Sequence, residues 1–131
     1  MRANAAALCA LLFCASCEGA AILGGGAGFA PRYGTVETTL LAEDLVSLTV
    51  TMEGARGAGD LRDFTDCAAS QFALIRGANF LRHVRTNLGE EGRARTADAA
   101  YTISRERPRG DRTLDAAATV AACRAAGIPT V

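Results

Sequence analysis

The stretch LVSLTVTM at residues 45–52 alternates strictly between apolar and polar side chains. Alternation with a period of two is the pattern of a β-strand that buries one face against a core. The side chains on the buried face would be Val46, Leu48, Val50 and Met52. Residues 35–41, which are rich in β-branched side chains, predict a strand before it, and Glu43 and Asp44 predict the turn between the two.

An amphipathic helix is expected after a loop at residues 54–59. Asp60 is the expected N-cap, with Asp63 three positions later in the capping-box position. Apolar side chains then recur at spacings of three and four, which indicates one buried helical stripe. They are Leu61, Phe64, Ala68, Phe72 and Ile75. Gly77 is the expected end of this helix.

Two more strands and a second helix are expected in the rest of the chain. The strands lie at residues 80–86 and 99–105, and a polar loop at residues 87–98 connects them. The helix would begin at Thr113 as N-cap and end near Ala126. Its apolar stripe would consist of Leu114, Ala117, Ala121 and Ala125.

This order of elements, ββαββα, predicts one small α+β domain at residues 35–131. The expected architecture is a mostly antiparallel four-stranded sheet with both helices packed on one face.

The N-terminus is typical of an export signal. Met1 and Arg2 supply a positive start, and residues 5–13 form an uncharged apolar run. A run of this length is too short to span a bilayer core of about 30 Å, so residues 1–16 are interpreted as a cleaved signal peptide. A buried N-terminal helix is the alternative, which the lack of caps disfavours.

The end of this segment, LLFCASC at residues 11–17, resembles the lipobox of bacterial lipoproteins, in which the signal is cut before a cysteine that carries the lipid. Ala15 and Ser16 match the small residues of the pattern. Cys14 departs from it, because an aliphatic residue is usual there. The resemblance implies a lipid on Cys17, such as palmitate, and a mature protein that faces the periplasm from a membrane.

Plain secretion is the alternative to a lipid anchor, with cleavage after Ser16 or near Ala21. Residues 17–34 are rich in glycine and alanine, which predicts a flexible tether. With a lipid on Cys17, this tether would connect the membrane to the domain.

Two of the five cysteines, Cys67 and Cys123, lie within the predicted domain. An even pair in an oxidising compartment predicts a disulfide, here between the two helices. The alternative is that both are small apolar side chains buried separately.

Composition excludes several kinds of chemistry. The chain has no lysine, which rules out Schiff-base catalysis, a Walker A lysine and a Ser-Lys dyad. Its formal net charge of zero argues against a nucleic-acid binder. One histidine and two distant thiols give no metal-ligand spacing, so neither a metal nor another cofactor is expected.

His83 is the only histidine, so a Ser-His-Asp or Cys-His arrangement would have to use it. A reduced Cys67 or Cys123 beside it would be a conceivable thiol nucleophile, although the favoured interpretation is a surface histidine on a strand. Arg105, Arg107, Arg109 and Arg112 form a local basic patch. This patch is interpreted as solvated surface, with anionic headgroups or an acidic partner as the alternative.

The loop that begins at Gly54 and ends at Gly59 joins a predicted strand to a predicted helix, where backbone amides can hold a phosphate. Its spacing is not G-x-G-x-x-G, and Asp60 would repel an anion, so a connecting loop is favoured. Arg56 within it is the candidate contact for a small anion.

The sequence as a whole predicts a cell-envelope lipoprotein whose domain has a binding or structural role toward an envelope partner. The alternatives are a periplasmic enzyme centred on His83 and a free cysteine, and a binder of small anionic ligands at residues 54–59.

Overall fold

The computed structural model describes residues 28–131, so the predicted signal peptide, Cys17 and most of the tether lie outside the described residues. The first strand begins three residues before the predicted domain boundary, at Arg32. The elements are β1 (Arg32–Ala42), β2 (Leu45–Glu53), α1 (Ala58–Ile75), β3 (Phe80–Glu91), β4 (Ala94–Ser104), β5 (Thr113–Asp115) and α2 (Ala116–Ala126).

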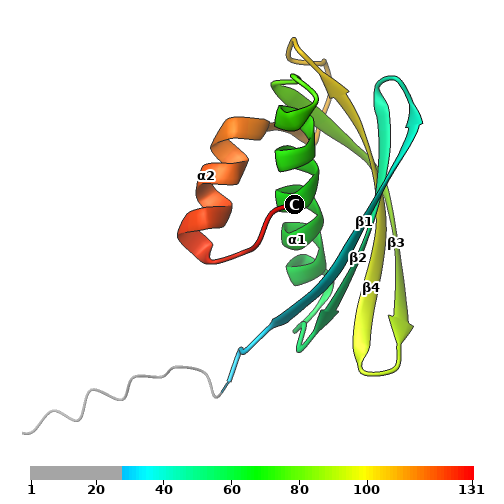
Figure 1. Ribbon diagram of the computed structural model, residues 1–131, viewed down its shortest axis with the longest axis vertical. Helices are drawn as coiled ribbons and strands as arrows, with labels where there is room; N and C mark the ends of the chain where they lie inside the picture. Colours follow the sequence, from blue (N-terminus) through cyan, green and yellow to red (C-terminus); the bar gives the residue numbers. More distant parts are fainter. Residues whose placement is uncertain (1–27) are drawn as a thin grey trace, which may run out of the picture.

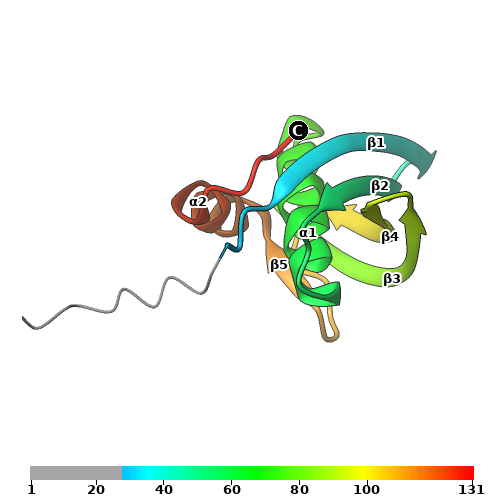
Figure 2. The same ribbon diagram turned by 90° about the horizontal axis from the view of Figure 1, so that it is seen from below.

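The strands form one antiparallel sheet in the order β1-β2-β4-β3-β5. The predicted α+β class with an antiparallel sheet is confirmed, but the sheet has five strands instead of four. It curls around α1, as Figures 1 and 2 show. Within residues 28–131, no helix is long and apolar enough to cross a membrane.

Both helices lie on the same side of the sheet, but they do not lie side by side on its surface. Helix α1 packs against β2, β3 and β4, whereas α2 packs mainly on α1 and reaches the sheet at β5 (Figures 1 and 2). The expectation that both helices pack on the sheet is therefore corrected to three layers, with α1 in the middle. The physical reason is that α2 follows β5 directly at the sheet edge and carries mostly alanine, which buries little area.

The core lies between α1 and the inner face of β2 and β4. Val46, Leu48, Val50 and Met52 of β2 are all buried, as their alternation predicts. Small residues bring α1 close to the sheet, because Ala68 and Ala69 of the helix are fully buried and so are Ala97 and Ala99 of β4. Tyr101 is the largest fully buried side chain, and it pairs with Val46 across the sheet.

Helix α1 begins three residues earlier than predicted. Gly57 is the N-cap and makes no side-chain capping bond, so the expected N-cap Asp60 lies in the first turn instead. The predicted end is confirmed, because Gly77 adopts a φ of 75°, and the N–H groups of Gly77 and Ala78 donate to the carbonyls of Leu74 and Ala73. Ile75, expected on the buried stripe, is 65% exposed.

The predicted polar loop at residues 87–98 is wrong. Strand β3 continues to Glu91, turns at Gly92 with a φ of 60°, and returns as β4 from Ala94. The sequence resembles a loop here because the far part of β3 is exposed and polar, including Glu90 and Glu91. An irregularity between His83 and Arg85 also breaks the alternation of β3.

The start of the last helix is also corrected. Thr113 belongs to β5, which pairs with β3, and Asp115 is the true N-cap, accepting a hydrogen bond from the Ala118 N–H at 2.9 Å. The buried stripe of α2 therefore differs from the expected one, because Leu114 lies in β5 and not in the helix. The buried residues of α2 are Ala116, Val120 and Cys123. The helix ends at Ala126, as predicted, and Gly127 after it adopts a left-handed conformation.

Candidate functional site

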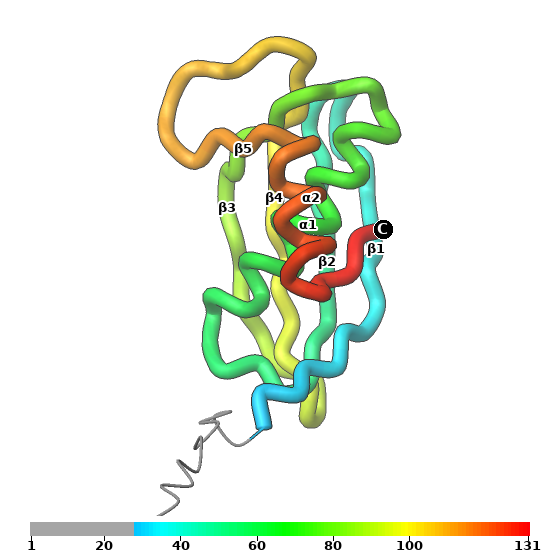
Figure 3. Tube along the Cα trace, turned by 90° about the vertical axis from the view of Figure 1, so that its left-hand side faces the viewer, coloured from blue at the N-terminus to red at the C-terminus, as the bar shows by residue number. Residues whose placement is uncertain are grey.

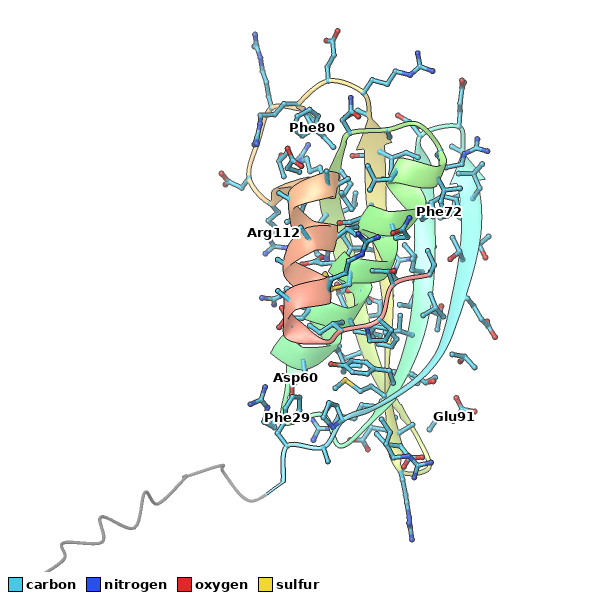
Figure 4. All side chains as sticks on the ribbon, turned by 60° about the vertical axis from the view of Figure 1, so that its left-hand side comes forward. Phe29, Asp60, Phe72, Phe80, Glu91 and Arg112 are labelled. Carbon is cyan, nitrogen blue, oxygen red and sulfur yellow. A yellow bond between two sulfur atoms is a disulfide. The ribbon has the colours of Figure 1, made fainter. Side chains whose placement is uncertain are left out.

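A cavity of about 200 Å³ lies between α1, β3, β5 and the segment that precedes β5. Its lining consists of Arg62 and Asp66 of α1, His83 of β3, Arg112, and Leu114 of β5. Figure 3 shows how the segment before β5 returns to the side of β3, and Figure 4 labels Arg112 there. Four ionisable side chains thus meet at one place from three separate parts of the chain.

A buried phenol supports the carboxylate of this cavity. The hydroxyl of Tyr101 donates to Oδ1 of Asp66 at 2.6 Å and lies 2.9 Å from the Thr65 hydroxyl. Burial raises the pKa of Asp66, and the hydrogen bond from Tyr101 opposes this rise. The pKa of Tyr101 is raised far above its ordinary value by burial and by the neighbouring carboxylate. Tyr101 therefore stays protonated and donates to Asp66.

His83 and Arg112 hold each other in place. The N–H of His83 donates to the carbonyl of Arg112 at 3.1 Å, and Nη1 of Arg112 lies 3.2 Å from Nδ1 of His83. A guanidinium can only donate, so Nδ1 accepts, and Nε2 carries the proton toward the Thr86 hydroxyl at 2.6 Å. His83 is thus a neutral imidazole, and burial and the charges of Arg112 and Arg62 lower its pKa.

Arg112 also has an unusual backbone. Its φ is 60°, and among residues 28–131 it is the one residue other than glycine with a positive φ. Such a conformation costs a long side chain about 1 kcal/mol or more and tends to occur at functional sites. The two hydrogen bonds to His83 help to hold this conformation.

The arginines of the cavity have no acidic partner within 4 Å in the described part of the chain. The ion pairs found there join Arg32 to Glu53, Arg56 to Asp60, and Arg85 to Asp98. Arg62 and Arg112 therefore present guanidinium groups that an anion can reach.

Arg56, the predicted anion contact, lies elsewhere and is already matched by a carboxylate. Its Nη2 donates to Asp60 at 2.7 Å, its Nε and backbone N–H donate to the same carboxyl group, and its guanidinium stacks 3.5 Å above the ring of Phe29. Figure 4 shows Phe29 and Asp60 close together near the start of α1. The hydrogen bonds with Arg56 lower the pKa of Asp60. Binding of an external anion by Arg56 stays a prediction.

Cys67 and Cys123 form the disulfide that the sequence predicts, and it joins α1 to α2 with their Cα atoms 5.9 Å apart. Neither sulfur is a free thiol, so the described residues contain no Cys-His pair with His83. His83 was a candidate from the sequence, but its contacts were not predicted. Arg112 was expected only as part of a surface patch, and Tyr101 lay within the predicted strand at residues 99–105 with no role assigned to it.

We expect His83 to make the protein less stable below pH 6.5. Because its pKa is lowered in the folded state, the unfolded chain takes up a proton below pH 6.5 that the folded chain does not. Stability contributed by the neutral imidazole is therefore present above pH 6.5 and is lost as the pH falls toward the lowered pKa. Urea unfolding at pH 7.5 and pH 5 should show a smaller loss for His83→Gln than for the wild type. Equal losses would contradict the assignment.

The comparisons with known proteins place the folded region in a family. The family described as YNQ4 C-terminal domain matches residues 33–127. A protein of Paracoccus denitrificans, described as "Uncharacterized 26.9 kDa protein in nqo8 5'region", is 28% identical over 88 residues, which cover 67% of this chain and 34% of that protein. The chain thus spans about a third of the length of this relative. No solved structure matches.

Proposed function

We propose that residues 33–127, over which the chain belongs to the YNQ4 C-terminal domain family, form a binding domain that is held at the cell envelope by a lipid on Cys17. Residues 1–16 would act as the signal peptide and residues 17–34 as the tether. The domain would face the periplasm and engage a small ligand or an envelope partner.

The observation that carries the proposal is the disulfide between α1 and α2. Disulfides form and persist outside the reducing cytosol, so a covalent link between Cys67 and Cys123 favours an exported domain. The apolar run at residues 5–13 and the lipobox-like residues 11–17 support the same interpretation independently.

The chemistry of the cavity favours binding over catalysis. Both ring nitrogens of His83 are engaged, one by Arg112 and the other by Thr86, so the ring fixes its neighbours in place. The two sulfurs that a nucleophile would need are bonded to each other. The remaining groups, two guanidinium groups and a carboxylate, are suited to holding charged groups of a ligand.

Replacement of Cys17 by serine is expected to release the protein from membranes. The wild-type chain should fractionate with membranes, and its intact mass should correspond to a start at Cys17 plus acyl chains. Cys17→Ser removes the sulfur that carries the lipid, so the chain should lose the acyl mass and leave the membrane fraction. Cys9→Ser is the matched control, because Cys9 lies outside the lipobox-like residues 11–17, and this variant should keep both.

A wild-type chain that starts at another residue and carries no acyl mass would overturn the lipid anchor. The same sample tests the compartment, because two further thiols should react with an alkylating reagent only after reduction. Free alkylation of Cys67 or Cys123 without reductant would overturn export into an oxidising compartment.

A further inference from the structure

Contacts with His83 preorganise Arg112 for an anion. Its backbone is fixed by the N–H of His83, and its guanidinium is oriented by Nδ1 of the same ring. This contact uses one Nη atom, Nη1. The other N–H groups of the planar guanidinium make no hydrogen bond in the described part of the chain. A guanidinium that is oriented in advance loses less freedom when it binds a carboxylate in two-point geometry.

Arg62 adds a second positive charge at the same cavity. It belongs to the first turns of α1, four residues before Asp66, and its charge reaches Asp66, His83 and Tyr101 closely enough to influence the pKa of each. Two guanidinium groups around one cavity favour an anionic group on the ligand.

Asp66 limits which anion can enter. Its Oδ1 accepts from Tyr101, while Oδ2 accepts no hydrogen bond from residues 28–131. A ligand with a double negative charge, such as phosphate, would be repelled by this carboxylate. A ligand that carries an ammonium group beside its own carboxylate would satisfy Oδ2 and the arginines together.

The size of the cavity sets the scale of the ligand. Its volume of about 200 Å³ is equivalent to about seven water molecules at roughly 30 Å³ each. This room suits a molecule of about six to ten non-hydrogen atoms, and Leu114 supplies an apolar wall for a short side chain.

We propose that this cavity binds a small amino acid, with the carboxylate held by Arg112 and Arg62 and the ammonium group held by Asp66. The proposal rests on the binding role proposed above, but it does not depend on the lipid anchor. No covalent step is involved, and Leu114 faces the side chain of the ligand.

Isothermal titration of the purified full chain tests the assignment, with racemic alanine as the probe. We expect one molecule to bind per chain. Propionate lacks the ammonium group and ethylamine lacks the carboxylate, so each should bind about tenfold or more weakly than alanine, because each loses a charge-assisted hydrogen bond. Inorganic phosphate should bind more weakly than alanine.

Variants assign the roles of the individual side chains. Arg112→Gly removes the guanidinium while relaxing the backbone at a φ of 60°, so alanine binding should fall about tenfold or more in a chain that still folds. Asp66→Asn should weaken alanine binding but not propionate binding. Arg93→Gln is the matched control, because it removes an exposed arginine in the turn between β3 and β4 and should leave alanine binding unchanged.

Three outcomes would overturn the proposal: no binding of alanine to the wild type, tighter binding of phosphate than of alanine, or undiminished binding of alanine by Arg112→Gly. The melting temperature of each variant shows that it is folded. Failure here would leave the membrane anchor standing, because fractionation and intact mass measure the anchor separately.

Discussion

Replacement of both Cys67 and Cys123 by alanine is expected to lower the free energy of unfolding by about 4 kcal/mol. The disulfide joins residues 56 positions apart, and the chain-entropy treatment of a loop of this length gives a loss of about that size. A domain this small has a total stability of roughly 5–10 kcal/mol, so the link supplies a large share of it.

The loss should begin in α2. This helix packs mainly on α1 and meets the sheet mainly at β5, so the disulfide at Cys123 is its covalent connection to the core. Hydrogen exchange at the amides of α2 should therefore rise more than exchange in β2 and β4 when the disulfide is removed. Guanidinium unfolding of the wild type and the double variant measures the total effect.

Reductant is the matched control for this prediction. It should destabilise the wild type to the level of the double variant and leave the double variant itself unchanged. A loss below about 1 kcal/mol would show that α2 is held by packing alone. Equal increases in exchange across the whole domain would contradict a loss that begins in α2.

The sequence predicts those elements whose pattern is local. Strand β2 alternates because one face is buried along its whole length, and Gly77 ends α1 because its left-handed φ suits glycine. The far half of β3 could not be found this way, since its side chains up to Glu91 are exposed and carry no alternation. Strand β5 exists only through its pairing with β3, which no local pattern contains.

The candidate site depends even more on contacts between residues that are far apart in the sequence. His83 is conspicuous as the only histidine, but its partner Arg112 is 29 residues away in the sequence, and Tyr101 is 35 residues from Asp66. These contacts depend on the position of α1 over β4 and on the return of the chain to β5. A positive φ at Arg112 is also invisible in the sequence, because arginine gives no sign of it.

Replacement of Tyr101 by phenylalanine is expected to lower the free energy of unfolding by about 2 kcal/mol. The variant keeps the buried ring but removes the hydroxyl that donates to Asp66 at 2.6 Å, and a hydrogen bond to a charged group contributes about 1.5–3 kcal/mol. Tyr33→Phe is the matched control, because it makes the same chemical change at a tyrosine whose hydroxyl has no hydrogen bond within residues 28–131, and it should cost little.

The charge on Asp66 makes this prediction depend on pH. Because the pKa of Asp66 is raised in the folded state, the folded protein takes up a proton on this carboxyl at a higher pH than the unfolded chain does. Burial of Asp66 therefore destabilises the fold as the pH rises through the raised pKa. The donor from Tyr101 offsets this penalty only while Asp66 is charged. The cost of Tyr101→Phe should therefore be largest near pH 7.5 and smaller near pH 4. The cost of Tyr101→Phe should also be smaller when Asp66 is replaced by alanine. An equal cost with and without Asp66 would assign the loss to packing of the phenol instead of to its hydrogen bond with the carboxylate.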